Sequence, residues 1–171
     1  QLLVYLPLLL AQLQIYLNLS WEAKMTYYDF DSFRHDAKVL AQKVKSEFDP
    51  DAILGIARGG LTLAHFLANA LDIRDCFSLN SIHYEKSKKL DTINIYNIPD
   101  LSKFKKVLIT DDIIDSGESM VAIKKKISNM YPNLEIAVAT IFYKPKALML
   151  PNFSIKEAND WIEFFWDLSL E

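Results

Sequence analysis

Cysteine, histidine and runs of basic residues are scarce in this chain of 171 residues, and each scarcity argues against a class of protein. Cys76 is the single cysteine, so neither an intrachain disulfide nor a cysteine-rich metal site can form. The three histidines, His35, His65 and His83, do not have the spacing of metal ligands. A formal net charge of −3 without a long basic run gives nucleic-acid binding little electrostatic support. The sequence therefore favours neither a disulfide-bonded protein, nor a cysteine- or histidine-based metal site, nor a nucleic-acid-binding protein.

The remaining composition is that of a globular protein. Hydrophobic residues make up 51% of the chain and charged residues 24%, and the length suits one domain with a sizeable buried core. Because the sequence around Cys76 is apolar, we expect its thiol to be buried and unreactive. A reducing cytoplasm fits these observations.

Residues 1–24 differ from the rest of the chain. The first 19 residues are almost all Leu, Gln, Tyr and Ile, and they carry no charge. They lack the basic start and the small-residue cleavage site of a signal peptide, and polar side chains interrupt a stretch already marginal for a membrane span. We interpret residues 1–24 as an appendage of unknown role, such as translated upstream sequence, before a domain at 25–171. The alternative is a membrane-surface or oligomer-contact helix, in which case membrane contact is confined to this segment.

From residue 30 onward the apolar spacing predicts strands that alternate with helices. The expected helices are 30–48, 61–71 and 119–130, and the expected strands are 52–57, 76–83, 107–110 and 135–143. Residues 84–104 are mostly polar and predict a long mobile loop or hairpin. This order predicts an α/β fold with a parallel, twisted sheet flanked by helices on both faces. Ligands of such sheets lie beyond the carboxyl ends of the strands, at the topological switch point.

The most informative segment follows the apolar strand at 107–110. Two adjacent acids, Asp111 and Asp112 (the acid pair), end the strand, and a turn before the next helix has the sequence Asp115-Ser116-Gly117-Glu118-Ser119. The N–H groups of a helix N-terminus attract a phosphate, and Gly117 gives the backbone the freedom to wrap around it. We call these five residues the phosphate turn.

The acid pair needs a different ligand, because carboxylates repel a phosphate. Ribose hydroxyls or a Mg²⁺ ion suit Asp111 and Asp112 better. Adjacent strand residues point to opposite faces, so at most one of the two points straight into a given pocket without a local twist. The alternative is that one acid caps the following helix while the other is solvated.

A second turn joins the strand at 52–57 to the helix at 61–71. Its residues are Ala57, Arg58, Gly59 and Gly60, and we call it the Arg58 turn. An arginine and two glycines between a strand and a helix form a tight turn with N–H groups directed at an anion. Two glycines after a strand also occur in plain turns, and it is the acid pair elsewhere in the chain that favours an anion site.

The acid pair with the phosphate turn resembles the phosphoribosyl-pyrophosphate (PRPP) signature of the type I phosphoribosyltransferases. That signature is an apolar strand, two acids, two variable residues and Asp-Ser/Thr-Gly-x-Ser/Thr. Among the purine-salvage members, the bacterial xanthine-guanine enzymes are similar in two further segments. These are Thr140-Ile141-Phe142-Tyr143-Lys144-Pro145 and Trp161-Ile162-Glu163-Phe164-Phe165-Trp166-Asp167. The resemblance runs from about Met25 to Leu168.

The resemblance implies a role for each motif in binding PRPP. The acid pair, Asp111 and Asp112, would hold the ribose hydroxyls, in part through Mg²⁺. The phosphate turn would bind the 5′-phosphate and the Arg58 turn the pyrophosphate. A flexible hood would contribute a basic residue, for which Lys88 and Lys89 are the candidates. The chain departs from many relatives at Ala57, where they have Ser, and at Glu118, where several have Gly or Lys.

The resemblance also implies how the purine is held. Asp115 would lie near N7 of the base as the general acid/base, and a carboxylate suits that proton transfer. Lys144 ends a strand, so its ammonium could reach the 6-oxo group. Trp161 would stack on the base, and the backbone around Trp161 and Ile162 would meet the 2-position. The alternative for Trp161 is a core aromatic, which is the interpretation we adopt for Trp166.

The activity implied is transfer of a phosphoribosyl group from PRPP to a 6-oxopurine, with Mg²⁺ as cofactor. Xanthine and guanine are the expected bases, and hypoxanthine follows them. A homodimer or homotetramer is expected by analogy. The alternatives are a hypoxanthine-guanine enzyme and a PRPP-sensing regulatory protein of the same fold, which should carry a basic surface or an added DNA-binding unit.

Overall fold

The computed structural model describes residues 25–84 and 92–170, which form two compact units. The larger unit is Phe30–Ala158, and the smaller one combines the chain before Phe30 with the chain after Ala158. The strands of the larger unit are β2 (Ala52–Ala57), β3 (Cys76–Tyr84), β4 (Thr92–Tyr96), β5 (Lys106–Ile114), β6 (Glu135–Tyr143) and β7 (Lys156–Glu157). Its helices are α2 (Phe30–Glu47), α3 (Gly59–Leu71) and α4 (Glu118–Met130). The two lysines proposed for the hood, Lys88 and Lys89, and the appendage at 1–24 lie outside the described residues.

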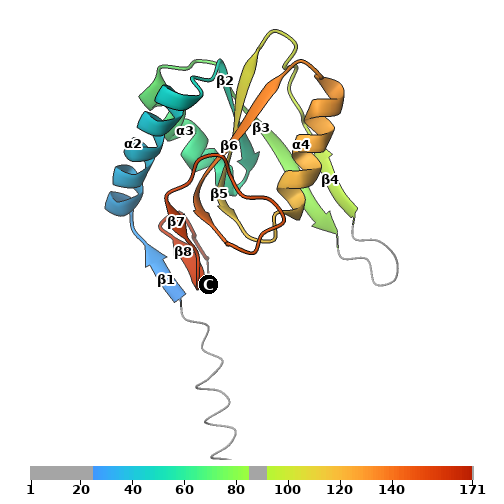
Figure 1. Ribbon diagram of the computed structural model, residues 1–171. Coiled ribbons are helices and arrows are strands. Elements are labelled where there is room, and N and C mark those ends of the chain that lie inside the picture. The colour runs from blue at the N-terminus through green and yellow to red at the C-terminus, as the bar shows by residue number, and fades with distance from the viewer. Residues whose placement is uncertain (1–24, 85–91, 171) are drawn as a thin grey trace, which may run out of the picture. The chain divides into compact units, whose positions relative to one another are not determined.

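The six strands form one sheet in the order β4-β3-β2-β5-β6-β7 (Figure 1). Every pairing is parallel except that of β4, which runs antiparallel to β3. The predicted α/β fold is therefore confirmed, with β3 and β4 as the hairpin arms in the region expected to be a loop or hairpin. Strand β5 is longer than expected, because it continues through the acid pair to Ile114.

Helices cover both faces of the sheet, with α2 and α3 on one side and α4 on the other (Figure 1). In β2, alternate residues Ala52, Leu54 and Ile56 join the apolar cluster that contains Ile123 and Ile127 of α4. The intervening Gly55 faces α3, where a Cβ atom would lie 2.9 Å from the Cβ of Ala64. Burial of each large aliphatic side chain contributes about 1.5–3 kcal/mol, so this two-sided packing fixes which residues reach the end of the strand.

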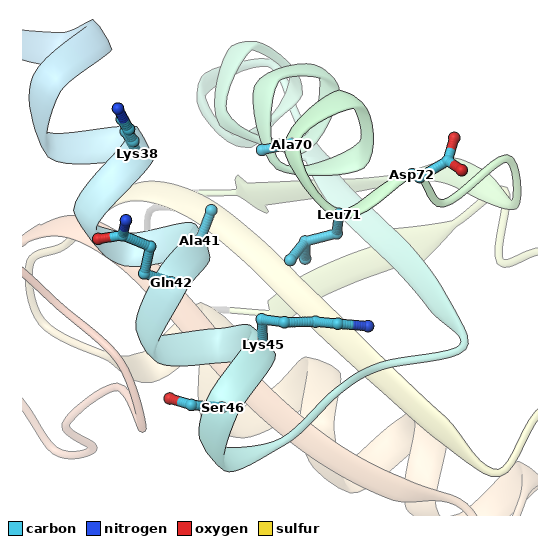
Figure 2. A pocket seen from close by; sticks show the side chains of 8 residues that line it. All are labelled: Lys38, Ala41, Gln42, Lys45, Ser46, Ala70, Leu71 and Asp72. Carbon is cyan, nitrogen blue, oxygen red and sulfur yellow. The ribbon is translucent and has the colours of Figure 1, made fainter.

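A groove of 570 Å³ lies between α2 and the C-terminal end of α3 (Figure 2). Its lining residues are Lys38, Ala41, Gln42, Lys45, Ser46, Ala70, Leu71 and Asp72. The Arg58 turn precedes the opposite end of α3, roughly 16 Å away at 1.5 Å per helical residue. This groove is therefore separate from the sequence motifs.

The smaller unit contains two parallel strands, β1 (Met25–Tyr28) and β8 (Trp161–Phe164). Tyr28 and Phe164 meet edge to face, with ring centroids 6.1 Å apart. Trp166 is half-buried and stacks on Phe164 at 4.7 Å, which agrees with its interpretation as a packed aromatic.

One expectation about the core is wrong. Cys76 is the first residue of β3, and its side chain is exposed at that end of the strand rather than buried. Partial desolvation nevertheless raises the pKa of its thiol, which keeps the thiolate fraction low. Within 25–84 and 92–170, no helix has both the length and the apolar character needed to cross a membrane.

Candidate active site

The Arg58 turn and the acid pair lie on neighbouring strands at the carboxyl edge of the sheet. From β2 the chain crosses through α3 to β3 on one side, while β5 pairs with β2 on the other. Pairing between β2 and β5 ends at Gly55 and Thr110, and the motifs follow directly. This is the topological switch point, where doubly wound sheets hold their ligands.

Close backbone contacts press the Arg58 turn against β5. At Gly59 a Cβ atom would lie 2.2 Å from a carboxylate oxygen of Asp112, and at Gly60 it would lie 2.1 Å from the carbonyl oxygen of Thr110. The buried hydroxyl of Thr110 donates a hydrogen bond of 3.1 Å to the carbonyl oxygen of Gly60. At Gly60, where the near atoms belong to the backbone, only glycine permits this approach, which brings two motifs far apart in the sequence into contact. The Ala57–Arg58 peptide bond is cis, and Arg58 is exposed.

The carboxylates of the two acids of the pair lie close enough to interact with each other. Asp112 lies toward α3 and contacts Gly59, whereas Asp111 lies beside Thr140, its partner in β6. The N–H of Asp112 donates to Asp111 Oδ1 at 3.0 Å, and the N–H of Ile113 donates to Asp112 Oδ1 at 2.7 Å. Neither acid caps the following helix, because the N-cap residue of α4 is Gly117.

Burial and the neighbouring negative charge of Asp112 raise the pKa of Asp111 well above its ordinary value. The acid pair therefore resists carrying two full negative charges. A bound proton or a cation relieves that repulsion, so the electrostatics of the pair favour a positively charged ligand. The described residues contain no group of three or more His, Cys, Asp or Glu side chains that could hold a metal.

The phosphate turn forms the exposed entry to α4. Gly117 has φ = 84°, a left-handed conformation that other residues rarely adopt, and no side chain caps the helix. Ser116 Oγ accepts a hydrogen bond of 3.3 Å from the N–H of Glu118, whose own side chain is exposed. Asp115 is not the N-cap of α4, because that position is Gly117.

Asp115 pairs instead with Lys144. Their side chains approach to 2.6 Å, and each remains substantially exposed. The backbone holds the two residues in register, because the N–H of Lys144 donates to the carbonyl oxygen of Ile114 at 2.8 Å. The residue predicted to read the 6-oxo group and the predicted acid/base are thus already in contact.

Trp161 and Ile162 belong to the smaller unit. Trp161 begins β8 and its side chain is 64% exposed, so it is not the core aromatic that was its alternative. Ile162 is buried. Their part in a purine site stays a prediction, as do the hood lysines Lys88 and Lys89 and the homo-oligomeric state.

Two contacts at the site involve residues that are not part of any of the sequence motifs. Thr110 is the one polar side chain between the apolar strand residues and the acid pair, and that polarity was an available signal for its bond to Gly60. The amides of Leu148 and Met149 lie against Ser116 and Gly117. Their surroundings in the sequence, apolar residues after a turn, carry no such signal.

The phosphoribosyl transferase domain model matches residues 27–171. The chain belongs to this family. Its members include the xanthine-guanine phosphoribosyltransferase of Cereibacter sphaeroides, 28% identical over 85% of this chain and 88% of the relative. The family resemblance seen in the sequence is therefore confirmed.

Solved structures of the family have the same fold. The xanthine-guanine-hypoxanthine phosphoribosyltransferase of Helicobacter pylori superposes with a TM-score of 0.79 at 32% identity, covering 84% of this chain and 94% of the other. A purine phosphoribosyltransferase of Pyrococcus horikoshii gives a TM-score of 0.74 at 27% identity over 85% and 95% of the two chains. These matches extend over nearly all of each relative.

Proposed function

We propose that this chain transfers the 5-phosphoribosyl group of PRPP to a 6-oxopurine, giving a nucleoside 5′-monophosphate and pyrophosphate. The observation that carries the proposal is the 2.6 Å ion pair between Lys144 and Asp115, the first residue of the phosphate turn. The names of the curated relatives support xanthine and guanine as the bases. The name of the Helicobacter pylori relative supports hypoxanthine as a third.

PRPP would span the switch point between β2 and β5. Its 5′-phosphate would enter the phosphate turn, where the amide of Glu118 now donates to Ser116 Oγ and would donate to a phosphate oxygen instead. Its pyrophosphate would lie along the Arg58 turn, whose guanidinium is exposed and available to an anion. The contact between Gly59 and Asp112 keeps the pyrophosphate and ribose subsites adjacent.

Mg²⁺ fits the acid pair. The ion usually binds one or two carboxylates and takes its other ligands from substrate phosphates and water, which is what a pair without a third protein ligand offers. The raised pKa of Asp111 points the same way, because a divalent cation removes the repulsion that raises it. Asp111 and Asp112 would hold the ion, which would neutralise charge on the pyrophosphate.

The base would be read by the ion pair. The ammonium of Lys144 would donate a hydrogen bond to the 6-oxo oxygen, a bond that the amino group of adenine cannot accept. This exchange would leave the carboxylate of Asp115 facing the ring nitrogen that loses its proton, and the proton would move to that carboxylate. Selection of the base and proton transfer would therefore use one pair of side chains.

Catalysis would come mainly from positioning and charge. An oxocarbenium-like transition state develops positive charge on the ribose, and the carboxylates of the acid pair lie on the strand beneath it in this arrangement. Holding both substrates at adjacent strand ends makes the transfer effectively unimolecular. No covalent intermediate with the protein is needed.

Nucleotide formation tests the proposal. The protein is supplied with PRPP and Mg²⁺ and with xanthine, guanine, hypoxanthine or adenine in turn, and products are separated by chromatography. Product from the 6-oxopurines but not from adenine is expected. Measurable PRPP binding without product from any base would contradict the proposal and favour a PRPP sensor.

A further inference from the structure

The segment between β6 and β7 runs along the outside of the phosphate turn. At its start the N–H of Lys144 donates to the carbonyl oxygen of Ile114, and four residues later the N–H of Leu148 donates to the carbonyl oxygen of Ser116, both at 2.8 Å. The two bonds flank Asp115 on either side. The backbone of residues 114–116 is thereby tied at two points to one neighbouring segment.

Gly117 lies against the same segment. A Cβ atom at Gly117 would be 3.0 Å from the amide nitrogen of Met149 and 3.1 Å from that of Leu148. A Cβ atom there would push this neighbouring backbone away by a few tenths of an ångström, and the left-handed φ of 84° also favours glycine. The N-cap residue Gly117 has no side chain to cap α4, and the neighbouring backbone adds contacts to the bond that Ser116 Oγ accepts from the N–H of Glu118.

We propose that residues 145–149 are a positioning element for the phosphate turn, acting chiefly through the amide of Leu148. This inference rests on the proposed function, because it concerns how tightly the turn holds the 5′-phosphate of PRPP. The Leu148 side chain is 72% exposed, so its contribution is made by the backbone. Amides that bind a phosphate must be held in place before it arrives, and a misplacement of about 1 Å can cost about 100-fold in rate.

The positioning element directly follows Lys144, the residue assigned to the base. The N–H of Ala147 donates to the carbonyl oxygen of Lys144 at 3.0 Å, which closes a tight turn between Lys144 and Leu148. Residues 145–147 and the hydrogen bond from Leu148 thus connect the backbone of Lys144 to that of Ser116, so a shift of the first would move the second. The base subsite and the 5′-phosphate subsite share one short piece of backbone.

Two proline variants in the same loop test the assignment. Leu148→Pro removes the N–H that donates to Ser116, whereas the N–H of Leu150 makes no hydrogen bond to the described residues. Pro151 already favours an extended conformation at position 150, so Leu150→Pro is a matched control. The dissociation constant for PRPP with Mg²⁺ is measured by calorimetry, together with KM for guanine and the melting temperature.

Leu148→Pro is expected to weaken PRPP binding by about threefold to tenfold, the range that loss of one hydrogen bond predicts. The KM for guanine should change less, and the two proline variants should have similar melting temperatures. Leu148→Ala retains the N–H and should restore most of the PRPP affinity. Equal PRPP affinity in Leu148→Pro and Leu150→Pro would overturn the inference.

Hydrogen exchange of the wild-type protein gives a check without any substitution. The Leu148 amide should be protected from exchange, the Leu150 amide should not, and PRPP should increase the protection of Leu148. An unprotected Leu148 amide, or protection unaffected by bound PRPP, would contradict the positioning role. If the wild type binds no PRPP, the proposed function fails. Exchange at the Glu118 amide, compared between Leu148→Pro and Leu150→Pro, then still decides whether residues 145–149 position the turn.

Discussion

The ammonium of Lys144 lies 2.6 Å from a carboxylate oxygen of Asp115, although the two residues follow different strands, β6 and β5, and are 29 positions apart. Both side chains are largely exposed, so the pair contributes little to folding stability. The pair matters for its position, because it places a cation and a carboxylate side by side at the ends of β5 and β6. A planar base with a carbonyl and an acidic ring nitrogen offers one partner to each.

Lys144→Ala should weaken binding of guanine by about tenfold to 100-fold, the range for loss of a hydrogen bond from a charged donor. Binding of PRPP should change far less, because the proposed role of Lys144 is to contact the base. Lys146→Ala is the control, since Lys146 is an exposed lysine of the same loop without an ion pair in the described part of the chain. Calorimetric titrations with each substrate separate the two effects. Equal losses for both substrates would argue against a role in base recognition.

Thr110 and Thr140 offer a paired test of how the Arg58 turn is held. Both side chains are fully buried in neighbouring strands, but only the hydroxyl of Thr110 has a partner, the carbonyl oxygen of Gly60. Thr110→Val should lower the free energy of unfolding by about 1 kcal/mol, whereas Thr140→Val should be neutral or stabilising. Urea unfolding measures both. A larger cost at Thr140 would contradict the bond assigned to Thr110.

Asp111 predicts an unusual pH dependence of stability. Its pKa in the folded state lies above the ordinary value of 3.8, so the folded protein binds this proton more tightly than the unfolded chain does. The protonated carboxyl therefore stabilises the fold fully below pH 3.8, and this stabilisation is lost as the pH rises through the folded-state pKa. Asp111→Asn keeps an oxygen for the N–H of Asp112 and removes the charge. The variant should be more stable than wild type at neutral pH, and the two should converge in acid.

Denaturation curves between pH 3 and pH 8, recorded without Mg²⁺, check this expectation. A difference between variant and wild type that is the same at every pH would show that charge repulsion is not its cause. Mg²⁺ together with PRPP should reverse the order at neutral pH, since the wild-type carboxylate binds the cation and the amide does not.

Most elements of the larger unit could be predicted because their buried residues are apolar and regularly spaced, whereas the exposed two-residue strand β7 was not predicted. The apolar pattern predicted the wrong boundaries where polar residues of the candidate site take the place of buried apolar ones. The apolar pattern ends at Thr110, but strand β5 continues through Asp111 and Asp112. Helix α3 begins at Gly59, inside the segment that was predicted to be a turn. Cys76 follows the charged residues Arg74 and Asp75 in the sequence and lies at an exposed strand end.

Contacts between distant residues were the other part that the sequence could not supply. Motif spacing indicated that the acid pair and the Arg58 turn share a sheet edge, but not that Asp112 touches Gly59. The ion pair of the buried Asp36 with the exposed Lys156 joins residues 120 positions apart, and nothing local marks it. The pairing of Asp115 with Lys144 is of the same kind, because each was assigned to the base and neither to the other.

The most direct test of the account is the turnover of Asp115→Asn with guanine, measured beside wild type at saturating PRPP and Mg²⁺. The amide has nearly the same shape but accepts no proton, so we predict a fall in kcat of about 100-fold to 10,000-fold. The melting temperature and the dissociation constant for PRPP should remain close to wild type. Turnover near the wild-type value would contradict the account and remove Asp115 from the chemistry.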